Sequence, residues 1–88
     1  MDNEEIDRYK RLMLVHSYIY YTLNDSIIGD DTWQKWANHL VRINRPTGFY
    51  DEAFDGWDGT TGHHLPKDNW IMNKALYLLR IHDEKYNF

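Results

Sequence analysis

Two adjacent apolar stripes of helical spacing run along the first part of the chain. The stripes consist of Ile6, Tyr9, Met13, His16 and Tyr20, and of Leu12, Val15, Ile19 and Leu23. This spacing predicts a helix over residues 3–22 whose apolar face is wide enough to pack against two other segments. Asp2 or Asn3 is placed to cap its start. We expect the 88 residues to fold as one small all-α domain, 1–88.

A second helical pattern follows a short turn. Asn24-Asp25-Ser26 is a cluster of turn-forming residues. Beyond it, apolar residues recur at helical spacing at Trp33, Trp36, Ala37, Leu40 and Val41. This pattern predicts a helix over residues 30–43, with Asp30 as its N-cap and with Asn44 and Pro46 ending it. The first two helices should therefore form an antiparallel hairpin with a short connection.

The stretch from Arg45 to Lys67 has no helical pattern. Prolines and glycines interrupt it at Pro46, Gly48, Gly56, Gly59, Gly62 and Pro66. Aromatic residues lie among them at Phe49, Tyr50, Phe54 and Trp57. A loop this long in a small domain either carries a function or is packed by its own side chains. The aromatic residues favour packing, and residues 50–54 fit a single helical turn.

A third helix is predicted over residues 68–83, with Asp68 as its cap. Its buried face is marked by Ile71, Ala75, Leu78, Leu79 and His82. No segment shows the alternation of a β-strand. The predicted fold is therefore all-α: a helical hairpin and a third helix, joined by a long aromatic- and Gly-rich loop over residues 45–67.

Composition indicates a compartment and argues against several kinds of partner. The chain has no cysteine, which excludes disulfides and thiolate metal sites and favours a reducing, cytoplasmic location. No apolar run is long enough to cross a membrane, and the acidic start of the chain is unlike a signal peptide. The net charge of −4 argues against direct sequence-specific binding to nucleic acid, which usually needs a basic surface.

The polar residues form no complete catalytic or metal-binding pattern. The five histidines lack the spacing of zinc ligands, so no metal site is predicted. The loop acids do not follow the ligand order of a calcium site, and Asp55-Gly56 and Asp58-Gly59 are typical of turns. Neither Ser17 nor Ser26 lies in a nucleophile elbow. We therefore predict a protein that is not an enzyme.

Two short segments carry a resemblance to a known family. They are His16-Ser17-Tyr18-Ile19-Tyr20-Tyr21 and Ile28-Gly29-Asp30-Asp31-Thr32-Trp33-Gln34. They resemble the small helical subdomain at the N-terminus of bacterial NAD-dependent DNA ligases. There a helix ends in Tyr-x-Tyr-His/Tyr, a loop of similar length follows, and Asp-x-x-Tyr-Asp opens the next helix. The likeness covers roughly residues 5–45 in helix pattern and loop length.

In the ligases this subdomain grips the nicotinamide mononucleotide half of NAD. The resemblance implies that Tyr20 and Tyr21 stack on a nicotinamide ring and that Asp30 hydrogen-bonds its amide or ribose. Trp33 stands where the family has tyrosine and keeps a stacking face, whereas Gln34 replaces an aspartate. The family's adenylated lysine, in Lys-x-Asp-Gly, has no counterpart here, the nearest segment being Ala53-Phe54-Asp55-Gly56. Nick sealing is therefore not expected.

The second half of the chain supports a different expectation. Residues 54–62 and the segment from Trp70 to Leu79 are similar to the tail of small ligase-related proteins encoded by phages and prophages. Together with the aromatic content, which is typical of interface residues, this favours a non-catalytic accessory protein that binds a host or phage protein. The alternatives are a weak binding module for nicotinamide mononucleotide or NAD, through Tyr20, Tyr21, Asp30 and Trp33, and a decoy or regulator of an NAD-dependent ligase.

Overall fold

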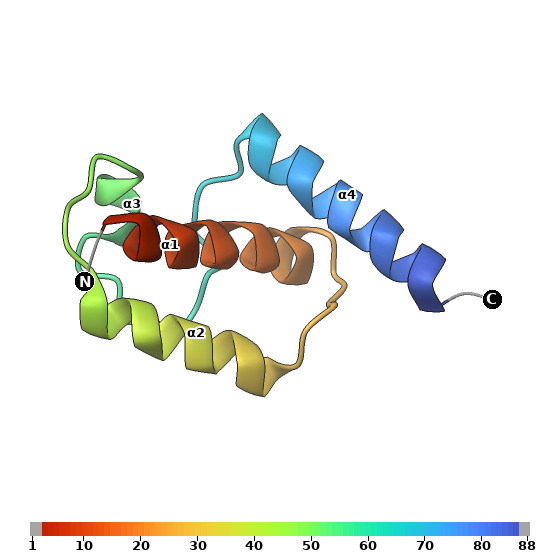
Figure 1. The fold of residues 1–88 in the computed structure, drawn as a ribbon, viewed down its shortest axis with the longest axis horizontal. Helices are drawn as coiled ribbons and strands as arrows, with labels where there is room; N and C mark the ends of the chain where they lie inside the picture. Colours follow the sequence, from red (N-terminus) through yellow and green to blue (C-terminus); the bar gives the residue numbers. More distant parts are fainter. Residues whose placement is uncertain (1–2, 87–88) are drawn as a thin grey trace.

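The structure, a computed structural model, describes residues 3–86. Its elements are α1 (Asn3–Ser17), the π-helix η1 (Tyr18–Thr22), α2 (Asp30–Ile43), α3 (Asp51–Phe54) and α4 (Asn69–Tyr86). No strand occurs within the described residues, which confirms the all-α prediction. Figure 1 shows α1 and α2 as an antiparallel hairpin, with α2 and α4 on opposite sides of α1.

The first predicted helix is present over its predicted length but changes type near its end. Tyr18 O accepts a hydrogen bond from Leu23 N at 3.1 Å, the five-residue step of a π-helix. The extra residue per turn shifts the phase of the side chains that follow. Tyr20 was predicted on the buried stripe and is instead 47% exposed. Asn3 belongs to α1 rather than capping it, and Asp2 lies outside the described residues.

The second helix has the predicted span but a different cap. Gly29 is the N-cap, with extended backbone angles of φ −72° and ψ 159°, and its carbonyl accepts from Trp33 N at 3.1 Å. Asp30 is already helical, so the prediction that it caps α2 was wrong, because a cap needs non-helical backbone angles. Asn44 caps the other end as predicted, with its N–H donating to Leu40 O at 2.8 Å.

The loop between α2 and α4 is packed by its own side chains. Phe54, Trp57 and Leu65 are buried in the core, and α3 matches the predicted helical turn. Trp57 Nε1 donates to Thr61 O at 2.8 Å, which satisfies the one polar group of that buried indole. After α3 the chain crosses from the α2 side of α1 to the α4 side (Figure 1).

A buried lysine fixes the start of this loop to α1. Lys10 is fully buried, and its Nζ donates to Phe49 O at 2.8 Å, Asp51 Oδ1 at 3.0 Å and Thr47 Oγ1 at 3.3 Å. Asp51 also accepts from the backbone N–H groups of Thr47 at 2.9 Å and Gly48 at 2.8 Å. All three donors of the ammonium are therefore satisfied, as burial of a charge requires.

Helix α4 is the least enclosed element. Asp68 precedes it as predicted, with its carbonyl accepting from Met72 N at 3.1 Å, while its carboxylate accepts from the Tyr50 hydroxyl. Ile71 and Ala75 are buried against α1 and η1. The helix then runs past the end of the hairpin (Figure 1). This projection accounts for a radius of gyration of 13.1 Å, slightly above the roughly 12 Å expected for this length.

Candidate functional site

A pocket of about 160 Å³ lies between η1, the connection to α2 and the first turns of α2. Its walls are formed by His16, Ile19, Tyr20, Tyr21, Ser26, Ile27, Ile28, Gly29, Asp30, Trp33, Gln34 and Thr60. The four residues predicted as a nucleotide site, Tyr20, Tyr21, Asp30 and Trp33, are all among them. The hairpin therefore brings the predicted residues together at one cavity.

The two tyrosines of η1 differ in how they are supported. Their rings meet edge to face, with centroids 4.8 Å apart. Tyr21 is half-buried, and its hydroxyl oxygen accepts a hydrogen bond from Thr61 Oγ1 at 3.3 Å. The His63 ring lies 5.7 Å from the Tyr21 ring. Tyr21 is thus supported by the long loop, whereas Tyr20 keeps about half of its surface available to a ligand or to solvent.

Trp33 is fixed by groups on α1 and on the loop. Its Nε1 donates to Ser17 Oγ at 3.3 Å, and its ring meets the Trp57 ring edge to face at 6.2 Å. Ser17 is buried, and a Cβ added to Gly62 would lie 2.1 Å from its Oγ. The loop backbone therefore packs directly on Ser17, and any side chain at residue 62 would displace the hydroxyl that orients Trp33.

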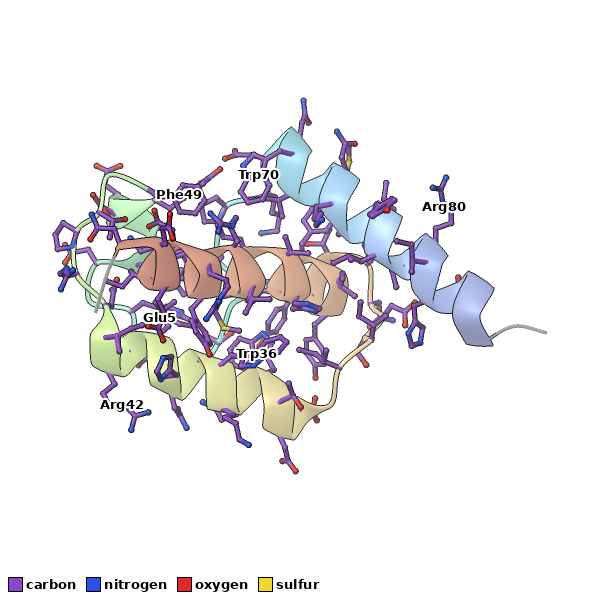
Figure 2. All side chains as sticks on the ribbon, in the orientation of Figure 1. Glu5, Trp36, Arg42, Phe49, Trp70 and Arg80 are labelled. Carbon is purple, nitrogen blue, oxygen red and sulfur yellow. The ribbon has the colours of Figure 1, made fainter. Side chains whose placement is uncertain are left out.

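His16 gives the pocket a buried imidazole. Its side chain is only 7% exposed, and its Nδ1 has no hydrogen-bond partner within the described part of the chain. The ring packs against Trp36 with centroids 5.4 Å apart, and Figure 2 shows Trp36 between α2 and α1. Burial lowers the pKa of His16 below its usual range. The imidazole is therefore neutral at neutral pH, with one polar atom unsatisfied.

Asp30 supplies the charge of the pocket. It is exposed, and it lies in the first turn of α2, where no side chain caps the backbone N–H groups. A carboxylate is favourable there because the helix dipole places partial positive charge at this end. Of the described residues that line the pocket, Asp30 alone carries a formal charge at neutral pH, since His16 is neutral. The pocket therefore disfavours a phosphate and tolerates a cation.

Gln34 connects the pocket wall to the long loop. Its Nε2 donates to Gly59 O at 3.0 Å. Gly59 has φ +79° and lies against α2, where an added Cβ would be 3.0 Å from Val41 Cγ2. Only glycine suits this backbone conformation and this close approach. The neighbouring Thr60 is thereby placed at the pocket, although it is distant in sequence from the other walls.

Eight of the twelve wall residues were not predicted as site residues, and His16 and Thr60 show two different reasons. The sequence pattern assigned His16 to an apolar stripe. An imidazole at a core position of that stripe was the signal that could have marked it as a site residue. Thr60 carried no local signal, because its place depends on how the loop packs against α2. The candidate site is therefore predictable in its helical part and not in its loop part.

The pocket offers groups that can hold a flat ring. Aromatic faces, a neutral imidazole and one carboxylate provide stacking and hydrogen bonding. Within residues 3–86 no group of three or more His, Cys, Asp or Glu side chains is placed to hold a metal ion. The helices of the described part of the chain are too short or too polar to cross a membrane.

Comparison of the chain with models of protein families, with curated proteins and with solved structures finds no match. The resemblance to the ligase subdomain thus stays a prediction from the two quoted segments.

Proposed function

We propose that the chain is a non-catalytic binding module whose pocket takes one flat heteroaromatic ring, such as the nicotinamide ring of nicotinamide mononucleotide or NAD. The convergence of Tyr20, Tyr21, Asp30 and Trp33 on one cavity of about 160 Å³ carries this proposal. A cavity of about 150 Å³ is sufficient for one benzene molecule. The volume therefore suits a single ring, with ribose and phosphate outside it.

Charge favours a cationic ring over a neutral one. The nicotinamide ring of oxidised NAD carries a positive charge, and aromatic faces attract a cation by about 0.5–2 kcal/mol. Asp30 adds a carboxylate at the same pocket. A ligand with so few atoms in a small, partly open pocket gains little binding energy, so we expect a dissociation constant of about 0.1–1 mM.

A titration followed by amide NMR tests the proposal with three related ligands. These are 1-methylnicotinamide, which is a cation without sugar or phosphate, neutral nicotinamide, and nicotinamide mononucleotide. The expected result is a set of shifts at Tyr20, Tyr21, Asp30 and the Trp33 indole N–H, with 1-methylnicotinamide binding about 3–10 times more tightly than nicotinamide. Silence at about 10 mM ligand, or shifts confined to other residues, would remove the proposal.

Two variants separate the role of charge from that of ring stacking. Asp30→Asn should weaken binding of 1-methylnicotinamide about fivefold and leave nicotinamide unchanged, because only the cation loses an attraction. Asp31→Asn is the matched control, since Asp31 is exposed and does not line the pocket. Tyr20→Ala should weaken both ligands and leave the fold intact, because Tyr20 is 47% exposed.

A second candidate function is an accessory role in the cytoplasm, exerted by binding a host or phage protein. It is favoured by large apolar side chains that α4 leaves exposed, Leu76 at 49%, Tyr77 at 47% and Ile81 at 39%. Exposed apolar patches can mark interaction sites, and tyrosine is enriched among the residues that dominate interface energies. A decoy role toward an NAD-dependent ligase is one form of it. Unchanged nick sealing by such a ligase in the presence of excess chain would exclude that form.

A further inference from the structure

A groove of about 410 Å³ lies between α1 and α4, and His16 is the one residue that it shares with the described lining of the ring pocket. Its apolar lining comes from Leu12 and Val15 of α1 and from Leu78 of α4. Trp70 lines it at the start of α4 and is 37% exposed; Figure 2 shows Trp70 beside Phe49. The groove is therefore an apolar surface between two helices, and Figure 1 shows α4 on the side of α1 opposite α2.

An exposed stripe of α4 continues this groove. Residues 70, 74, 77 and 81 are spaced by four, three and four, so their side chains share one face of the helix. Trp70, Tyr77 and Ile81 on that face are 37%, 47% and 39% exposed. The stripe spans three turns, or about 16 Å at the rise of an α-helix. Its length matches a short partner helix better than a small ligand.

The groove has a positive rim. Arg8, Arg11 and Lys74 line it and are exposed, and no acidic residue of the described chain lines it. Each cation lies near the centre of an aromatic ring. The distances are 5.5 Å from Arg8 to the Tyr9 ring, 5.8 Å from Arg11 to the Phe49 ring and 5.5 Å from Lys74 to the Tyr77 ring. Within the described residues none of the three lies within ion-pair distance of a carboxylate. On a chain of net charge −4, this is a local reversal of sign.

The charge also varies along the groove. Arg8 and Arg11 are shared with a second depression, toward the start of α1, which Glu4, Glu5 and Asp7 line. Carboxylates of a partner are therefore attracted where they face Arg11 and Lys74. They are repelled where they face the acidic residues at the start of α1. This pattern specifies the direction in which an acidic helix lies, because reversing it would bring like charges together.

We propose that this groove binds an acidic amphipathic helix of a partner protein. Apolar side chains of the partner, three and four residues apart, enter the groove and contact Trp70 and Leu78. Its flanking carboxylates contact Arg8, Arg11 and Lys74. This is the helix-in-groove mode of recognition, in which apolar residues give affinity and charges give specificity.

Selection from a displayed library of random peptides of about 15 residues tests the proposal on the full chain. The charge-reversed variant Arg11→Glu/Lys74→Glu serves for comparison. The enriched peptides should be acidic, should carry apolar residues at spacings of three and four, and should bind the variant about tenfold more weakly. Enrichment of basic or uncharged peptides, or no enrichment, overturns the proposal.

The double variant Lys35→Glu/Arg42→Glu is the matched control. It changes the net charge by the same amount at two exposed residues of α2. Peptide affinity should stay within about twofold of the unsubstituted chain, because rim charges act locally at physiological salt. An equal loss in both variants would mean attraction to overall charge and would overturn the groove assignment.

Other occupants give distinct results in the same experiments. Dimerisation in solution that Arg11→Glu/Lys74→Glu abolishes would assign the groove to a second copy. Tight binding of a labelled single-stranded oligonucleotide that the same variant abolishes would assign it to nucleic acid. Either result overturns the proposal of an acidic helix.

Discussion

Helices α2 and α4 both pack against α1, on opposite sides and in different ways (Figure 1). Helix α2 is connected to its surroundings by polar contacts along its length, including Trp33 to Ser17 at 3.3 Å, Gln34 to Gly59 at 3.0 Å and His39 to Glu5 at 3.1 Å. Helix α4 packs through Ile71 and Ala75 and leaves several large apolar side chains exposed.

This difference indicates that the molecule consists of a cooperatively folded body and a peripheral helix, α4. The body, formed by α1, η1, α2 and the long loop, contains the fully buried Phe54 and Lys10 and the ring pocket. Segments with few buried contacts open locally at lower free energy than the core. We therefore expect α4 to open while the body stays folded, which would separate the two walls of the groove between α1 and α4.

Truncation of one buried isoleucine in each region gives the largest expected effect. Ile6 and Ile71 are both fully buried. Ile6→Ala should destabilise the whole domain by about 4 kcal/mol and lower hydrogen-exchange protection throughout. Ile71→Ala should lower protection in α4 and leave α1 and α2 protected. Equal loss of protection in all helices of both variants would show that α4 and the body unfold as one unit.

Removal of the buried ammonium tests the polar link between α1 and the loop. Lys10→Met keeps the length of the side chain but leaves Phe49 O and Asp51 without their shared donor. Breaking a buried pair is strongly destabilising, and Asp51 is partly exposed, so we expect a loss of about 3 kcal/mol in urea denaturation. Arg11→Met, at the exposed next residue, should stay within about 0.5 kcal/mol. A similar loss for both would argue against this link.

Overpacking beside Trp33 should have a smaller effect that is specific to the pocket. In Gly62→Ala the new Cβ would lie 2.1 Å from Ser17 Oγ, so the backbone or the serine must move. We expect a loss of about 2 kcal/mol and a shift of the Trp33 indole N–H resonance. Gly29→Ser is the control for stability, because its Cβ meets no atom within 4 Å and serine is a favourable N-cap residue for α2. An unperturbed Trp33 signal would contradict the arrangement described.

The smallest effect is a dependence on pH that arises from His16. Burial lowers its pKa in the folded chain, so the unfolded chain binds the proton more readily. The stability that neutral His16 contributes is complete above a pH of about 6.5 and is lost as pH falls through the folded-state pKa. The urea concentration at the unfolding midpoint should therefore decrease as the pH is lowered from about 7.5 to about 5.5. The decrease should be smaller in His16→Gln. His64→Gln, at an exposed residue, should keep the slope of the unsubstituted chain.

The hairpin was predictable because its signals are local. The spacing from Trp33 to Val41, and the turn residues before it, specified α2 without knowledge of any partner. Lys10 was not predictable in the same way. A lysine among polar neighbours on a helix is normally solvated, and its burial depends on acceptors at residues 47–51, which lie far away in sequence.

The candidate site also contains residues that local signals predict and residues that they do not. Tyr20, Tyr21, Asp30 and Trp33 flank one short connection, so any hairpin would bring them near each other. The exposure of Tyr20 followed from a change of helix type that apolar spacing does not reveal. Thr60 enters through the close packing of Gly59 on α2, a tertiary contact that no local pattern encodes.

The π-helical turn η1 also has a consequence for chain length. Each of its hydrogen bonds spans one residue more than an α-helical bond, so the turn reads as an α-helix with a single inserted residue. Deleting one residue between 18 and 22 would let the helix continue as α and would rotate the following side chains by about 100° about its axis. The single extra residue of η1 thus allows Tyr20 to line the pocket, whereas a continuous α-helix would place it on the buried stripe.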